Sequence, residues 1–170
     1  EWIDKIRTHL SYMSDVITAV KGQAVTLSNE QAVAFSVEEL VKHVNILMKH
    51  ELKNALINLK TVANIDTSTI VNGNINSLVQ VINNIISNSI QAYQSKNKTN
   101  EDINFTIYKE GQNIIFKIQD FAGGLPEKVQ QKLFKEMVTT KGKNGTGLGL
   151  FMSYSNIRAH FNGKLKYETE

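Results

Sequence analysis

The sequence predicts an α+β fold in which one sheet carries helices on one of its faces. Helix-like and strand-like patterns alternate in blocks along the chain and form no regular series of βαβ units. Two strand-like runs, 103–108 and 114–118, flank the turn-like residues 110–113, which is typical of an antiparallel hairpin. The 170 residues, 41% of them hydrophobic, are enough to bury one core of ordinary size.

Composition excludes several function classes. The formal net charge is +3 and the charges are interspersed, so no basic stripe suits nucleic acid and none is expected as a partner. Zero Cys excludes a disulfide scaffold, a thiolate zinc site and a Cys nucleophile, and agrees with a reducing compartment. No apolar run approaches the roughly 18 residues of a membrane span and no signal-peptide pattern opens the chain, so we expect this chain to be soluble.

The first 35 residues are expected to lie apart from the main domain. We predict a helix within residues 1–24, a polar linker at 25–35 and a domain at 36–170. The helix is shorter than three heptads, so a coiled-coil partner helix and an amphipathic helix packed on its own domain are equal alternatives. Its apolar residues recur at spacings of three and four: Ile3, Ile6, Leu10, Met13, Ile17 and Val20.

The main domain is expected to begin with a capped helix. Ser36 and Glu39 form the pattern of a capping box, in which each side chain pairs with the other residue's backbone amide. Apolar residues at helical spacing carry this helix to about Leu52.

The pattern then changes several times. We expect a strand within 55–62, a short strand at 69–71 followed by a turn at Asn72-Gly73, and a long helix at 75–93.

After the hairpin, the sequence predicts two more helices and a strand. Pro126 begins a short helix to about Phe134, since Pro suits the first helical position. A Gly-containing loop follows at 139–147, then a helix at 148–161 and a last strand at 164–167.

The long helix carries a row of carboxamide side chains beside its apolar stripe. Asn is disfavoured in helix interiors. A ridge of carboxamides on one face of the helix therefore indicates a functional role, and it consists of Gln80, Asn84, Asn88 and Gln91. A carboxamide oxygen is a neutral hard ligand, suited to Mg²⁺ that phosphates already neutralise. The alternative is a solvated polar face in an Asn-rich chain.

A second segment, Asp120-Phe121-Ala122-Gly123-Gly124, follows the hairpin. A carboxylate at a strand end can accept a hydrogen bond from an exocyclic amine, and Gly lets a flat ring lie against the backbone. Adenine would fit such a place. The alternative is a plain strand-to-helix turn.

A third segment, 142–150, has four Gly in the eight residues 142–149 and runs into a helix. Backbone amides in such a loop, together with the helix N-terminus, suit a phosphate. The alternative is a flexible Gly loop.

In this order and spacing, the three segments resemble the N, G1 and G2 boxes of the GHKL ATPase superfamily. Within it, GTGLGLFMS and VINNIISNSIQAY look most like sensor histidine kinases. The segment LFKEMVTTKG resembles the F box and ATP lid, and the first helix resembles the second helix of the dimerisation domain. The resemblance covers about residues 36–167 and implies a Bergerat-type two-layer α/β sandwich with a mixed, mostly antiparallel sheet.

The resemblance also implies roles for particular residues. ATP and Mg²⁺ are the implied ligands, with Asn88 and Asn84 at the metal, Asp120 reading adenine and Gly124 beneath the ring. The remaining implied nucleotide-binding residues are Gln91, Lys141, Gly145, Thr146, Gly147, Leu148 and Gly149.

The implied activity is transfer of the ATP γ-phosphate to a His on a dimerisation domain, for relay to an Asp of a response regulator. The implied partners are that His-containing domain, a response regulator and a second copy within a homodimeric parent. We identify no phosphoacceptor motif at His9, His43, His50 or His160, so we expect an excised catalytic fragment that cannot complete the reaction alone. The expected location is cytoplasmic, with membrane anchoring of the parent left open.

The sequence departs from the family pattern at three further places. Ala122 replaces the first Gly of the G1 box, which is a mild change only if its φ is negative. Gln91 stands where many of these kinases have a phosphate-contacting Lys. Met137 and Val138 occupy a usually aromatic place in the F box.

Four alternative functions stay open. An ATP-hydrolysing GHKL enzyme is disfavoured because Asn84 stands where such enzymes have a general-base Glu, and an anti-sigma-factor kinase would not need the first helix. A degenerate nucleotide-binding scaffold would bind ATP without transfer. A plain helix-mediated dimerisation protein would bind no nucleotide.

Overall fold

The computed structural model describes residues 33–125, 127–130 and 148–169. The chain divides into two compact units, one of residues 32–124 with 168–170 and one of residues 1–31 with 125–167. We call the first the larger unit and the second the smaller unit, and describe each by itself. The predicted first helix, the end of the helix after Pro126 and the loop at 139–147 lie outside the described residues.

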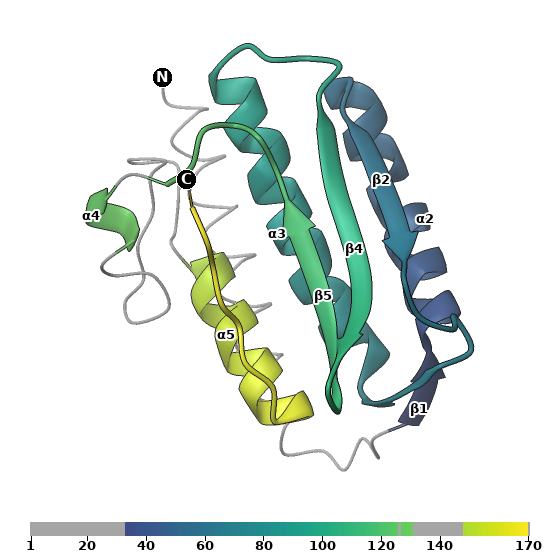
Figure 1. The fold of residues 1–170 in the computed structure, drawn as a ribbon. Coiled ribbons are helices and arrows are strands. Elements are labelled where there is room, and N and C mark those ends of the chain that lie inside the picture. The colour runs from purple at the N-terminus through teal and green to yellow at the C-terminus, as the bar shows by residue number, and fades with distance from the viewer. Residues whose placement is uncertain (1–32, 126, 131–147, 170) are drawn as a thin grey trace, which may run out of the picture. The chain divides into compact units, whose positions relative to one another are not determined.

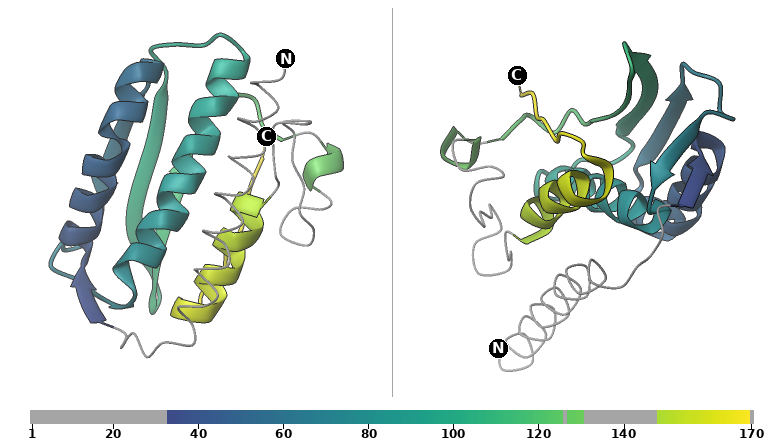
Figure 2. Two further views of the ribbon diagram at one scale, coloured as in Figure 1. Left: turned by 180° about the vertical axis from the view of Figure 1, so that it is seen from behind. Right: turned by 90° about the horizontal axis from the view of Figure 1, so that it is seen from below.

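The larger unit confirms the predicted α+β fold. Its strands β2 (Asn58–Ala63), β4 (Asp102–Glu110) and β5 (Asn113–Gln119) form one sheet in that order, with β2 parallel to β4 and β4 antiparallel to β5. Helices α2 (Val37–Ala55) and α3 (Ile75–Ser95) lie side by side on one face of this sheet, as Figures 1 and 2 show. The predicted hairpin is confirmed by the pairing of β4 with β5.

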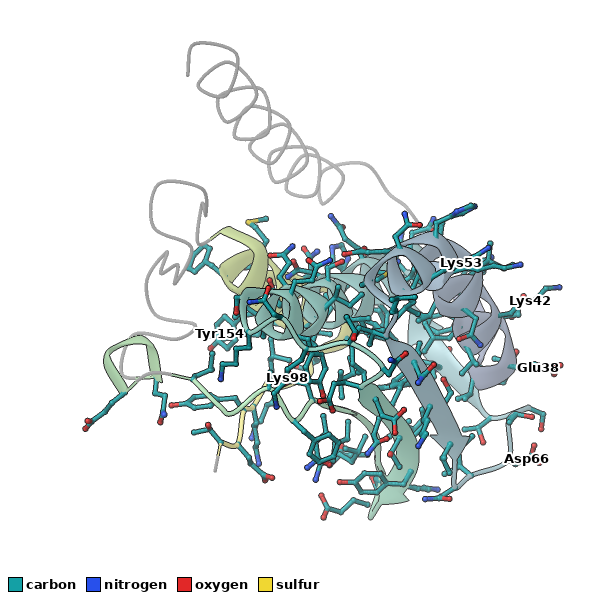
Figure 3. All side chains as sticks on the ribbon, turned by 90° about the horizontal axis from the view of Figure 1, so that it is seen from above. Glu38, Lys42, Lys53, Asp66, Lys98 and Tyr154 are labelled. Atoms are coloured by element: carbon teal, nitrogen blue, oxygen red, sulfur yellow. The ribbon has the colours of Figure 1, made fainter. Side chains whose placement is uncertain are left out.

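Helix α2 begins at the predicted capping box. The Ser36 hydroxyl oxygen accepts a hydrogen bond from the Glu39 amide at 3.1 Å, and Glu39 Oε2 accepts from the Ser36 amide at 3.0 Å. Its buried residues face the sheet and α3, while the charged side chains of Glu38, Lys42 and Lys53 point outward (Figure 3).

The predicted end of α2 was three residues too early. Ala55 is buried on the helix's apolar face and is the last helical residue, and Leu56 caps the helix in a left-handed conformation with φ of 56°. The Leu56 and Ile57 amides then donate to carbonyls of the last helical turn. The strand predicted from residue 55 therefore begins only at Asn58.

A small second sheet was not predicted. Strand β1 (Val33–Ser36) pairs antiparallel with β3 (Ile70–Gly73) and places Val33 opposite Gly73. Asn72 and Gly73 thus lie in a strand, and the predicted turn at these residues is wrong because β1 supplies a partner. Strand β1 also occupies the last residues of the predicted linker.

The core of the larger unit lies between α2, α3 and the inner face of β4. Ile103, Phe105 and Ile107 of β4 are fully buried, as the alternation of a half-buried strand requires. The Asn74 side chain caps α3 by accepting from the Ser77 amide at 3.0 Å. The buried residues of α3 are Leu78, Val79, Val81, Ile82, Ile86, Ser89, Ile90 and Tyr93.

The described part of the smaller unit contains α4 (Glu127–Gln130) and α5 (Leu148–Phe161). The bounds of α5 confirm the predicted helix. The strand predicted at 164–167 is wrong, because no described strand pairs with these residues. The Tyr167 hydroxyl instead donates to the Gln130 carbonyl at 3.0 Å. No helix in the described ranges combines the length and the apolar character that crossing a bilayer requires.

Candidate functional site

Asp120 lies directly after β5, and two hydrogen bonds hold its carboxylate. Oδ2 accepts from the Ser89 hydroxyl of α3 at 2.7 Å, and Oδ1 accepts from the Ala122 amide at 3.0 Å. Ser89 itself is buried. The carboxylate is therefore tied both to the helix that carries the amide ridge and to its own loop.

The two glycines of this loop lie in a backbone conformation that favours a residue without a side chain. Gly123 and Gly124 have φ of 99° and 71°, a conformation that L-residues rarely adopt. Ala122 is buried and is not among the residues with positive φ. The Ala in place of the first Gly of the G1 box is therefore the mild change, without backbone strain.

Tyr93 joins the start of β4 to the Asp120 loop. Its hydroxyl accepts a hydrogen bond from the Phe121 amide at 2.7 Å and donates one to the Asp102 carbonyl at 2.8 Å. The side chain is fully buried. Burial raises the pKa of the Tyr93 phenol, as do the charges of Asp120, Glu101 and Asp102, while the bond from Phe121 opposes the rise.

Two lysines just beyond the end of α3 hold carbonyl groups of the same loop. Lys96 Nζ donates to the Ala122 carbonyl, and Lys98 Nζ donates to the Phe121 carbonyl at 3.4 Å (Figure 3 labels Lys98). A Cβ added at Gly123 would lie 2.8 Å from Lys96 Nζ, so the lysine passes close over the glycine.

Sequence reasoning missed these contacts from the end of α3. A usable signal was present, because Ser89, Tyr93 and Lys96 are separated by four and three residues, the spacing of one helix face. We call Ser89, Tyr93 and Lys96 the α3 clamp.

The amide ridge splits into two kinds of position. Asn84 and Asn88 are half-buried and lie one turn apart on α3, whereas Gln80 and Gln91 are exposed. Asn88 directly precedes Ser89, so the ridge reaches the helical turn that contacts Asp120. Two carboxamides on one helical row fit a hard cation such as Mg²⁺ with phosphate ligands. Among the described residues, no three His, Cys, Asp or Glu side chains gather as a metal site.

The Gly-rich segment is only partly described. Leu148 begins α5 and Gly149 is exposed in its first turn, which confirms that the segment opens a helix. The other predicted phosphate-site residues, Lys141, Gly145, Thr146 and Gly147, lie outside the described residues, as do Met137 and Val138.

His50 is the one described histidine with an acidic neighbour in sequence, Glu51. The Glu51 carboxylate accepts from the Ser87 hydroxyl of α3 at 2.8 Å, whereas His50 is exposed. Consecutive residues on a helix point in different directions. His50 and Glu51 therefore point away from α2 in different directions, with Glu51 turned toward Ser87 of α3.

Residues 73–170 match the model of the family described as histidine kinase-, DNA gyrase B-, and HSP90-like ATPase. The chain belongs to this family. The match includes the amide ridge, the Asp120 loop and the Gly-rich segment, so the resemblance to the GHKL superfamily is confirmed.

Curated members of the family that resemble the chain are kinases. Sporulation kinase C of Bacillus subtilis is 29% identical over 160 residues, which cover 93% of this chain and 34% of that protein. The signal transduction histidine-protein kinase AtoS of Escherichia coli is 37% identical over 90 residues, covering 53% of this chain and 14% of that protein. The chain thus corresponds to about a third or less of these relatives' length, and is homologous to sensor kinases in their ATPase domain.

Solved histidine kinase structures share the fold. The histidine kinase AdeS of Acinetobacter baumannii superposes with a TM-score of 0.72 at 20% identity, covering 99% of this chain and 77% of that one. Histidine kinase ThkA, in complex with response regulator protein TrrA, superposes with a TM-score of 0.60 at 22% identity, covering 82% of this chain and 40% of that one.

Proposed function

We propose that this GHKL domain binds ATP with Mg²⁺ and transfers the γ-phosphate to a histidine of a dimerisation domain. One observation carries the proposal: the Asp120 carboxylate and its glycines are held in a fixed loop that α3 ties to the Asn84–Asn88 ridge. Family membership supplies ATP as the nucleotide.

Asp120 is the proposed adenine-reading residue. Its two oxygens each accept one protein hydrogen bond and keep lone pairs for the exocyclic amine of adenine. Gly124, four residues further along the chain, offers backbone without a side chain against which the ring can lie.

Asn88 and Asn84 are the proposed ligands of Mg²⁺, which would neutralise charge on the transferring phosphoryl group. The proposed phosphate contacts are Gln91 together with Lys141, Gly145, Thr146, Gly147, Leu148 and Gly149. No general base is required of the domain, because phosphoryl transfer depends mainly on positioning and charge stabilisation.

The proposed reaction forms a bond from a histidine nitrogen to the γ-phosphorus and breaks the bond from that phosphorus to the β,γ-bridging oxygen. ADP leaves, and the phosphohistidine then passes its phosphoryl group to a response-regulator Asp. Asn84 favours transfer over hydrolysis, since a carboxamide cannot activate water as a general base. The proposed partners are a dimerisation domain within a homodimeric kinase and a response regulator. The proposed location of the domain is the cytoplasm, where ATP is found.

The test is calorimetric titration with a non-hydrolysable ATP analogue, with and without Mg²⁺. We expect a dissociation constant between about 1 µM and 1 mM, roughly −8 to −4 kcal/mol, that Mg²⁺ tightens. Absence of binding would overturn the proposal. Binding followed by no phosphate transfer to an added His-bearing dimerisation domain would instead favour a nucleotide-binding scaffold.

A further inference from the structure

We infer that Ser89 is a positioning residue that sets purine selectivity by fixing the Asp120 carboxylate. The inference rests on the proposed function, because it takes Asp120 as the group that reads the base. It assigns the selectivity to a buried helix residue that lies behind Asp120 and that has no need to touch the nucleotide.

The rest of the α3 clamp fixes the backbone around Asp120. The Phe121 amide is bound by the Tyr93 hydroxyl at 2.7 Å, and the Ala122 carbonyl is bound by Lys96. Tyr93 is fully buried and also donates to the Asp102 carbonyl at the start of β4. With the backbone held at the two following residues, the side-chain torsions are the main freedom left to Asp120.

Ser89 removes that freedom. Its hydroxyl is 2.7 Å from Oδ2, and the side chain is only 4% exposed, so water competes poorly for this bond. A carboxylate only accepts hydrogen bonds, so the direction of the bond is fixed: Ser89 donates. The second oxygen is held by the Ala122 amide at 3.0 Å. The remaining lone pairs of the Asp120 carboxylate therefore point in fixed directions, and they can pair only with a hydrogen-bond donor on the base.

Such a fixed acceptor discriminates between purines. The exocyclic amine of adenine donates a hydrogen bond, whereas the 6-oxo group of hypoxanthine cannot, and a mismatched pair leaves the carboxylate unsatisfied. A carboxylate that could rotate would escape the mismatch and would also pair less well with the amine. We therefore expect Ser89 to act on the ratio of affinities for the two bases.

The experiment measures dissociation constants of ADP and inosine 5′-diphosphate with Mg²⁺ by calorimetry on the full chain. In Ser89→Ala we expect about three- to tenfold weaker binding of ADP, the effect of one hydrogen bond, and less than about twofold change for inosine diphosphate. Ser87→Ala is the matched control, because Ser87 lies on the same helix and also donates to a carboxylate, Glu51 Oε2 at 2.8 Å. It should leave both constants unchanged.

A double-mutant cycle tests that Ser89 acts through Asp120. In an Asp120→Asn background, Ser89→Ala should change the ratio of the two constants by less than about twofold, because the group that it positions is already altered. Equal weakening of both nucleotides in Ser89→Ala, or an unchanged ratio, would overturn the inference while leaving the proposed function intact. Failure of the wild-type chain to bind ADP would count against the proposed function itself.

Discussion

The backbone amide of Phe121 donates a hydrogen bond of 2.7 Å to the hydroxyl oxygen of Tyr93, a fully buried residue of α3. The same hydroxyl donates to the Asp102 carbonyl at 2.8 Å. One side chain thus connects the helix of the amide ridge, the first residue of the central strand and the loop that carries Asp120. The fold and the candidate nucleotide site share this connection, so both should respond when it is broken.

Replacing Tyr93 by Phe should destabilise the larger unit. The ring would stay in the core, but the Phe121 amide and the Asp102 carbonyl would both lose their partner in a buried place. We expect a loss of about 1–3 kcal/mol in the free energy of unfolding, measured by urea denaturation. Tyr108→Phe is the control, since Tyr108 is a half-buried tyrosine of β4 and its replacement should cost less than about 0.5 kcal/mol. Equal losses in the two variants would contradict the role of the Tyr93 hydroxyl.

The Tyr93 hydroxyl should make the free energy of unfolding depend on pH in the alkaline range. Burial raises the pKa of Tyr93 above its ordinary value of 10.0. The stabilisation is therefore complete below that ordinary value, which the unfolded chain keeps, and is lost as pH rises toward the higher pKa of the folded state. Urea midpoints measured between about pH 8 and pH 11 should fall more steeply for the wild type than for Tyr93→Phe. Parallel curves would argue against a proton held by Tyr93.

Replacing Gly123 by Ala should weaken nucleotide binding as well as the fold. At φ of 99° an L-residue costs about 1–2 kcal/mol, and the new Cβ would press against Lys96, which holds the loop. Gly111→Ala offers a control for strain alone, because Gly111 also has positive φ, at 59°, and has open space around it in the β4–β5 hairpin. Both variants should lose stability in denaturation, but only Gly123→Ala should raise the dissociation constant of an ATP analogue.

Local signals in the sequence predicted much of the fold. The capping box placed the start of α2 because Ser36 and Glu39 satisfy each other's amides without help from distant residues. Helix α3 and the β4–β5 hairpin followed from periodicity for the same reason. The predictions failed where a distant partner decides: Asn72-Gly73 is in a strand only because β1 pairs with it, and residues 164–167 alternate like a strand but pair with no described one.

The candidate site shows the same division. Asp120 and the glycines after it were identified from residue type and order. The residues that hold them were missed, because Ser89, Tyr93 and Lys96 each bond to a loop at least 26 residues away along the chain. No pattern within the helix states which loop will fold against it.

Replacing Asn88 by Ala should abolish the part of nucleotide binding that depends on Mg²⁺. Asn88 is half-buried on α3, one turn from Asn84 and directly before Ser89 of the α3 clamp. Of the two proposed metal ligands, its carboxamide oxygen is therefore the one nearer in sequence to the residues that hold Asp120. Calorimetry with an ATP analogue should show wild-type affinity tightened by Mg²⁺ and a variant whose weaker binding is the same with and without the ion. Gln80→Ala removes an exposed carboxamide from the same helix and should leave the Mg²⁺ effect in place. If Asn88→Ala kept that effect, the metal would have to be held elsewhere, and the ridge would be a solvated polar face of α3.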